Sequence, residues 1–167
     1  MTTPPANPTA LTQDQRRVAA RLVYGRPNRT IAEEVRLSVD GVASHLAAAR
    51  KKLTRPGSSR AVLAHALLMT REVPPPSTNG PAPEFTELDR RVIRAITEHT
   101  LNSDIGDAIG IRGDDVRAEI DAVVAKASAH NAAHLVGLAH AWGILPDTTS
   151  PHLRSQPAPA AATAGAA

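Results

Sequence analysis

The chain repeats itself, and this repeat constrains the fold more than any other feature of the sequence. A shift of 74 residues aligns positions 11–53 with positions 85–127 without a gap, and ten of the aligned pairs are identical. Apolar positions also match, as in Val35 with Ile109 and Leu37 with Ile111. An ungapped register with matched core positions indicates one module used twice. The identical pairs are Thr12/Thr86, Arg16/Arg90, Arg17/Arg91, Val18/Val92, Asn28/Asn102, Ile31/Ile105, Asp40/Asp114, Val42/Val116, Ala48/Ala122 and Lys52/Lys126.

Each copy is predicted to contain four helices. Thr12 with Gln15 has the spacing of a capping box, as has Thr86 with Asp89, and Gly25 is expected to end the first helix of the first copy. Asparagine is a good N-cap, so the second helices are expected to start near residues 28 and 102 with asparagine as their caps. The third helix of the first copy follows a serine cap at position 38, and the fourth helices lie in "SRAVLAHALLMT" and "NAAHLVGLAHAW".

The composition favours a core of packed helices. The chain has one Trp, one Tyr and one Phe, so alanine, leucine and valine must form the core, and the predicted fold class is all-α. Three stretches are rich in proline and poor in core-forming residues, and they predict a disordered tail at 1–10, a flexible linker at 74–83 and a disordered Pro/Ala-rich tail at 148–167. The two domains are then expected at 11–73 and 84–147.

The two predicted domains differ in charge. Residues 11–73 hold 12 Lys+Arg and 5 Asp+Glu, a net charge of +7, whereas residues 84–147 hold 6 Lys+Arg and 11 Asp+Glu, a net charge of −5. With Arg154 these values recover the overall +3. Only the basic domain has the electrostatic character expected of a DNA-binding module.

The first copy resembles the LuxR-type, or GerE-like, helix-turn-helix domain. The resemblance covers nearly all of that copy, although its loop "TRPGSS" is about two residues longer than is usual in the family. The second copy keeps the apolar pattern but has His99, Gly106, Arg112 and Glu119 where the first has Gly25, Ala32, Ser38 and His45. The positions that carry the resemblance are Leu11, Thr12, Gly25, Asn28, Ile31, Ala32, Val35, Leu37, Ser38, Val42, His45, Lys52, Leu53, Arg60 and Ala61.

The resemblance implies a DNA-binding transcriptional regulator. Its third helix would enter the major groove of double-stranded DNA, and its fourth helix would often form a dimer contact. The exposed half of the third helix offers Ala43, Ser44 and Ala47, which provide little hydrogen bonding to base edges. We therefore expect binding mainly through phosphates, with modest sequence preference. The candidate DNA-contacting residues are Arg29, Thr30, Ser38, Ser44, His45, Arg50, Lys51, Lys52, Arg55 and Arg60.

Two features of this candidate surface have alternative interpretations. The basic run at the end of the third helix is also what a solvated helix end carries to complement the helix dipole. Asp40 repels phosphate unless it caps the third helix. His45 is more typical of a residue that packs in the fold or faces a phosphate than of a residue that takes part in a chemical reaction.

The second copy is not expected to bind DNA, because Asp114, Asp115 and Asp121 lie on the face that would approach the duplex. It could dimerise, dock on the first copy, bind another protein, or serve only as a stabilising repeat. The fourth helices look more apolar than domains of this size can cover, which predicts a self-contact and a possible homodimer. The candidate interface residues are Leu63, Leu67, Leu135, Leu138 and Trp142.

Other function classes have little support in the sequence. No nucleophile elbow, phosphate loop or zinc-protease motif is present, so we expect no enzyme activity, no catalytic residue and no cofactor. His130 and His134 have i,i+4 spacing but lack further ligands in sequence, so we expect no metal site. The absence of cysteine, of a long apolar run and of a signal-peptide pattern leads us to expect a cytoplasmic, nucleoid-associated protein without membrane contact. The alternative function is a protein-interaction module that acts on transcription machinery or on another DNA-binding protein.

Overall fold

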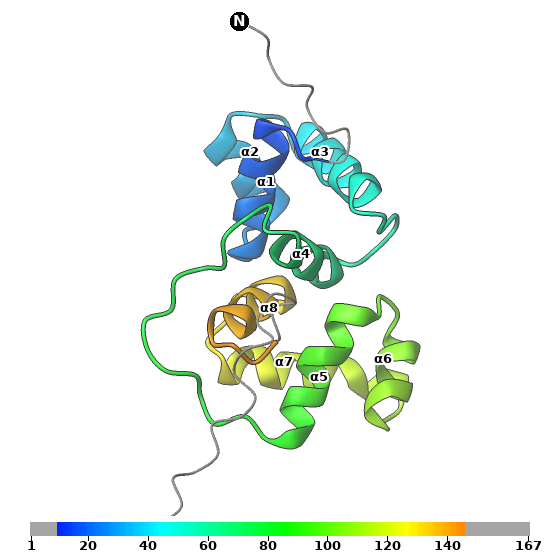
Figure 1. Ribbon diagram of the computed structural model, residues 1–167. Helices are drawn as coiled ribbons and strands as arrows, with labels where there is room; N and C mark the ends of the chain where they lie inside the picture. Colours follow the sequence, from blue (N-terminus) through cyan, green and yellow to red (C-terminus); the bar gives the residue numbers. More distant parts are fainter. Residues whose placement is uncertain (1–9, 146–167) are drawn as a thin grey trace, which may run out of the picture.

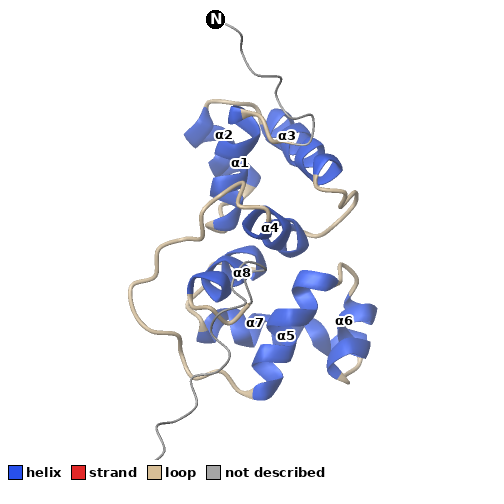
Figure 2. Cartoon of the chain, viewed as in Figure 1, coloured by secondary structure: helices blue, strands red, loops and turns tan. Residues whose placement is uncertain are grey.

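The computed structural model describes residues 10–145, and all the regular structure in this part of the chain is helical (Figure 2). The all-α prediction is therefore confirmed for these residues. The expected tails lie almost wholly outside the described residues, as do residues 146 and 147. The helices are α1 (Gln13–Val23), α2 (Asn28–Val35), α3 (Val39–Lys52), α4 (Arg60–Met69), α5 (Glu87–Glu98), α6 (Asn102–Ile109), α7 (Gly113–Lys126) and α8 (Ala132–Ala141).

The helix bounds follow the sequence repeat. Adding 74 to the bounds of α2 and α3 gives the bounds of α6 and α7, since 28 becomes 102 and 52 becomes 126. The bounds of α4 and α8 differ by 72, since 60 becomes 132, so the loop before α4 is two residues longer than the loop before α8. We call residues 10–73 the first half and residues 84–145 the second half.

The caps explain why several of these helices begin where they do. Thr12 and Gln15 form a complete capping box at α1, and Thr86 and Asp89 form the same box at α5. Ser38 Oγ accepts a hydrogen bond of 2.9 Å from the backbone N–H of Gly41, and thereby caps α3. These three capping predictions are confirmed.

The prediction that asparagine caps the second helix of each copy is wrong. α2 and α6 do begin at Asn28 and Asn102, but their cap positions are Pro27 and Leu101, and neither helix has a side-chain cap. The side chain of Asn28 has another role, because its Oδ1 accepts a 2.6 Å hydrogen bond from Nη1 of Arg60 at the start of α4.

Buried apolar residues from both halves form one core. Within the first half, α1 packs on α2, α3 and α4, and within the second half, α5 packs on α6, α7 and α8. The two halves meet along α4 and α8, which lie side by side at the centre of the molecule (Figure 1). Further contacts between the halves join α4 to α5 and α1 to α8.

The segment 74–83 is packed against the helices, although the sequence predicted a flexible linker. Pro76 is buried, and the indole Nε1 of Trp142 donates a 3.3 Å hydrogen bond to the carbonyl of Gly80. The proline ring fits against α8, where Gly137 leaves room for it. Local composition indicated the lack of regular structure, but not this tertiary packing.

Candidate nucleic-acid interface

The helix-turn-helix geometry of the first half comes from α2, a short turn and α3. Arg36 ends α2 in the left-handed region, with φ 58°, and its N–H donates to the carbonyl of Ala32. The backbone N–H of Leu37 donates to the same carbonyl at 2.9 Å. Ser38 then starts α3, so three residues reverse the chain and lay α3 against α2.

The exposed face of α3 contains Asp40, Ala43, Ser44, Ala47 and Lys51. Their spacing of three and four residues places them on one side of the helix. On the opposite side Val42, Leu46 and Ala49 are buried in the core. The middle of this face therefore carries only small side chains, with a carboxylate at the start of the helix and an ammonium group near its end.

Asp40 lies in the first turn of α3 but does not cap it, since Ser38 makes the capping bond. Of the two interpretations of this carboxylate, the structure supports a solvent-facing group. It opposes a polyanion, although it also interacts favourably with the helix dipole.

Three of the predicted phosphate contacts are exposed cations. Arg29 lies in the first turn of α2 with its side chain 88% exposed and its Nε 3.7 Å from Glu33. Lys51 and Arg55 are exposed near the end of α3 and in the loop that follows. Exposed side chains of this type can reach phosphate without the loss of packing.

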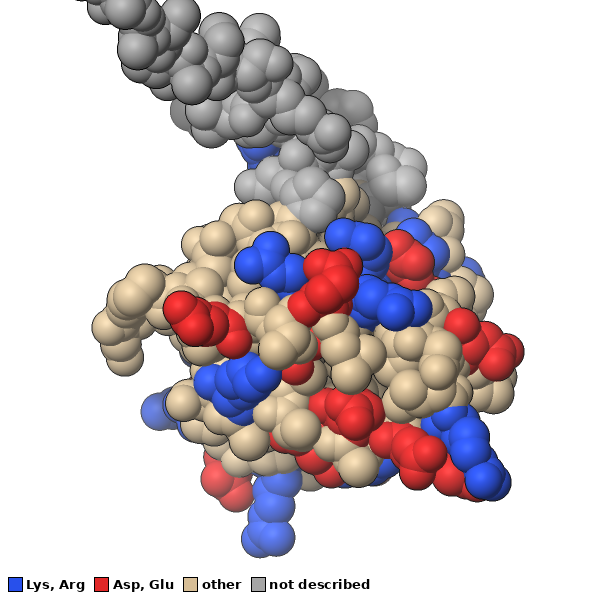
Figure 3. Space-filling view, turned by 90° about the horizontal axis from the view of Figure 1, so that it is seen from below, with Lys and Arg blue, Asp and Glu red and all other residues tan. Residues whose placement is uncertain are grey.

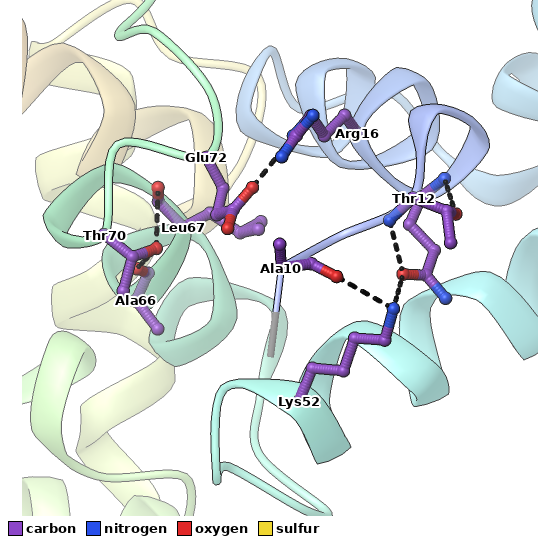
Figure 4. A network of polar contacts seen from close by, with 9 residues as sticks. Ala10, Thr12, Arg16, Lys52, Ala66, Leu67, Thr70 and Glu72 are labelled. Atoms are coloured by element: carbon purple, nitrogen blue, oxygen red, sulfur yellow. Dashed lines mark hydrogen bonds and ion pairs between the residues drawn. The ribbon is translucent and has the colours of Figure 1, made fainter. Parts of the chain in front are cut away.

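Lys52 has a structural role that the sequence did not predict. Its Nζ donates to the carbonyl of Ala10 at 3.0 Å and to Oε1 of Gln15 at 2.9 Å, which ties the end of α3 to the start of α1 (Figure 4). The repeat preserves this tie, because the equivalent Lys126 pairs with Asp89 in the second half. The identity of the two lysines therefore reflects a shared packing contact.

The carboxyl of Asp89 responds to this tie. Burial raises its pKa, but hydrogen bonds from Lys126 and Thr86 outweigh that effect, so the pKa lies below its ordinary value. In the second half, Lys126 therefore pairs with an ionised carboxylate, that of Asp89. In the first half, Lys52 pairs with the neutral amide of Gln15.

Arg60 also has a structural role that the sequence did not predict. Nη1 donates to Asn28 and Nη2 donates to the carbonyl of Arg26, both at 2.6 Å, so the guanidinium holds the turn between α1 and α2. Burial, with Arg50 as the smaller cause, lowers its pKa. Arg50 is held as well, since its Nε donates to the carbonyl of Ser58 at 2.9 Å, and burial lowers its pKa.

The remaining predicted DNA contacts are divided. Ser44 is exposed on α3, whereas Thr30 and His45 are half-buried, and Ser38 uses its hydroxyl oxygen for the cap. The structure thus leaves Arg29, Ser44, Lys51 and Arg55 as solvent-facing groups on α2, on α3 and in the loop after α3.

The sequence reasoning missed Arg36. This residue is exposed in the turn of the helix-turn-helix, at a backbone conformation that favours glycine. The equivalent position in the second half is Gly110, with φ 81°. Thr54, Arg71 and Ser128 adopt the same conformation after other helices, so the conformation marks a helix end, and it is the exposure of the Arg36 guanidinium that adds a cation to the candidate surface.

The equivalent face of the second half has the opposite character. Asp114, Asp115 and Asp121 are exposed on α7, and Arg117 lies 3.2 Å from Asp121 across one helical turn. Viewed from the end formed by the second half, acidic side chains alternate with basic ones over the surface (Figure 3).

The predicted interface residues pack inside the chain. Leu63, Leu67, Leu135 and Leu138 are buried, and Trp142 is half-buried with its ring 6.0 Å from Phe85. The apolar surplus of the fourth helices is therefore covered by contacts within one chain. A homodimer stays a prediction, but the surface that suggested it is occupied.

Two further findings concern other function classes. Among residues 10–145, no three or more His, Asp or Glu side chains gather where they could hold a metal ion, and His130 and His134 instead stack on each other with ring centroids 4.9 Å apart. None of the helices in the same range is long and apolar enough to span a membrane.

Comparison with known proteins does not assign the chain to a family, since no protein-family model, curated protein or solved structure matches it.

Proposed function

We propose that the chain is a DNA-binding transcriptional regulator built from two LuxR-like four-helix modules, joined by the Pro-rich segment 74–83. The first module binds duplex DNA with α3 in the major groove. The observation that carries this proposal is the set of exposed cations Arg29, Arg36, Lys51 and Arg55 on α2, α3 and the adjoining turns and loop of a helix-turn-helix. Phosphate contacts of this kind position a protein on the duplex.

Binding of this kind depends on charge more than on sequence. Ala43 and Ala47 can touch thymine methyl groups, and Ser44 can donate or accept a hydrogen bond, but bidentate base recognition needs longer side chains. The expected result is modest sequence preference and strong dependence on salt.

The second module serves protein interaction or association of the regulator. Its net charge of −5 and the exposed aspartates of α7 oppose contact with a polyanion. A cytoplasmic, nucleoid-associated location fits a protein that works on duplex DNA.

A second candidate function is a protein-interaction module that acts on transcription machinery or on another DNA-binding protein. The specific observation in its favour is that α3 lacks a side chain able to make bidentate contact with a base at positions 43, 44 and 47. Exposed cations such as Arg29 and Lys51 also fit an acidic protein partner.

Binding of the full chain to a fluorescently labelled random-sequence duplex, measured by anisotropy at low and at moderate salt, separates the two candidates. DNA binding that weakens steeply with salt supports the regulator. An Arg94→Ala chain is the matched control, because this exposed cation lies on α5 in the second half, and it should bind as the unsubstituted chain does. Absence of binding at low salt would favour the protein-interaction module.

A further inference from the structure

The two halves of the chain contact each other reciprocally. Asn131, the cap residue of α8, donates from Nδ2 to the carbonyl of Gly25 at 2.8 Å, in the turn after α1. Ser59, the cap residue of α4, donates from its backbone N–H to Oγ1 of Thr100 at 3.1 Å, in the turn after α5. Each fourth helix therefore begins against the first turn of the other half.

The helix packing has the same reciprocity. α1 packs on α8 and α5 packs on α4, so exchanging the two halves converts one contact into the other. The same exchange leaves the pairing of α4 with α8 unchanged. This is the pattern of an isologous interface, in which a two-fold axis makes two subunits use the same surface patch.

The approach of the halves is close at one glycine of α8. A Cβ added at Gly137 would lie 2.8 Å from Cγ of Pro76 and 2.9 Å from Cγ1 of Val23. Both of these atoms lie outside the second half. Gly137 thus allows α8 to settle on α1 and on the segment 74–83, and a larger residue would push the halves apart.

Polar groups flank the same contact. Tyr24 stacks on His134 with ring centroids 6.4 Å apart, and His65 on α4 bonds His140 on α8. Buried leucines lie on both helices, so the contact combines an apolar centre with specific bonds at its edge. Such a contact has the anatomy of a subunit interface.

We infer that the second half takes the place of a partner subunit, so that the free chain is a monomer whose α4 surface is occupied in cis. The occupant of that surface is the chain's own second half. This inference concerns the protein alone and is independent of the proposed DNA binding.

The mass of the full-length protein in solution, measured by light scattering over a range of concentrations, tests the inference. The unsubstituted chain should have the mass of a monomer throughout. The Gly137→Val chain should melt at a lower temperature, because the added side chain meets Val23 and Pro76, while the control Gly80→Ala, whose added Cβ meets nothing within 4 Å, should keep its melting temperature. A dimeric unsubstituted chain, or a Gly137→Val chain with an unchanged melting temperature, would overturn the inference.

Thiol cross-linking covers the case in which Gly137→Val fails to fold. The chain contains no cysteine, so a Tyr24→Cys/His134→Cys chain carries only the two introduced thiols. A short bis-maleimide added to dilute protein should link them within one chain and leave a monomer on a denaturing gel. Cross-linked dimers as the main product would contradict pairing in cis.

Discussion

Nδ1 of His65 lies 2.9 Å from Nε2 of His140, across the contact between α4 and α8. A hydrogen bond at this distance requires one nitrogen to donate and the other to accept, so at least one of the two must be unprotonated. Arg55 contributes a positive charge near the pair, and His140 also lines a cleft together with Arg71. The surroundings of the pair therefore oppose its double protonation.

This relationship predicts that acid destabilises the protein. Burial, then His140 and Arg55, lowers the pKa of His65 from 6.5 to about 4. The unfolded chain binds more protons than the folded chain between these values, so the contribution to stability is present above pH 6.5 and is lost as the pH falls toward 4. The shift corresponds to at most about 3 kcal/mol, and the partial exposure of His65 reduces this to roughly 1–2 kcal/mol.

The melting temperature measured from pH 7 to pH 4 checks this prediction. The melting temperature of a His65→Leu chain should fall less over this range than that of the unsubstituted chain. His45→Gln is the control, because His45 is a half-buried histidine on α3, away from the α4–α8 pair. Equal pH dependence of the His65→Leu and unsubstituted chains would contradict the assignment.

Gly106→Ala should destabilise the second half. An added Cβ would lie 2.7 Å from the carbonyl oxygen of Ile111, in a turn where the backbone cannot move freely. The expected cost is about 1–3 kcal/mol, measured as a lower denaturant midpoint. The Gly80→Ala chain should keep its denaturant midpoint, because a Cβ added at Gly80 has no neighbouring atom within 4 Å. A Gly106→Ala midpoint as high as that of the control would show that the turn has room to relax.

Arg36→Gly should raise stability and weaken DNA binding together. The left-handed conformation of Arg36 is strained for a side chain and natural for glycine, as at Gly110. Relief of this strain, less the entropy of the freer unfolded chain, stabilises by up to about 1 kcal/mol. The free energy of unfolding, measured by chemical denaturation, should thus rise while the affinity for duplex DNA falls. A loss of stability would show that the Arg36 side chain stabilises the fold.

Asp40→Asn should strengthen binding to duplex DNA of any sequence. The carboxylate is exposed at the start of α3, and its removal takes away a repulsive charge while Ser38 keeps the cap. The fold loses about 0.3–1 kcal/mol of helix-dipole interaction. Anisotropy at low salt measures the gain, and weaker binding would indicate that Asp40 orders α3.

Much of the local structure could be predicted from the sequence because its causes are local. The capping boxes at Thr12 and Thr86, and the cap at Ser38, depend on residues three positions apart. The predicted caps at Asn28 and Asn102 failed because each asparagine is the first residue of its helix, one position after the cap.

The candidate site was only partly predictable. A run of cations such as Arg50, Lys51 and Lys52 looks uniform in sequence, but the structure holds the first and the last through bonds to distant backbone carbonyls. The apolar surplus of α4 and α8 predicted a contact between copies, whereas the structure covers it by packing the two helices on each other within one chain. Its occupant was not evident, because pairing in cis depends on how the segment 74–83 folds back.

The neighbouring residues Lys51 and Lys52 give the most direct measurement of the central claim, that exposed cations of the first half bind phosphate. Lys51→Ala should leave stability within about 0.5 kcal/mol and should reduce the slope of log affinity against log salt by about 0.9. Lys52→Ala should instead destabilise by about 1–3 kcal/mol, since Gln15 and Ala10 lose their donor, and at temperatures where it is folded it should keep the unsubstituted slope. A Lys51→Ala chain with an unchanged salt slope, or a Lys52→Ala chain that alone loses it, would contradict the account.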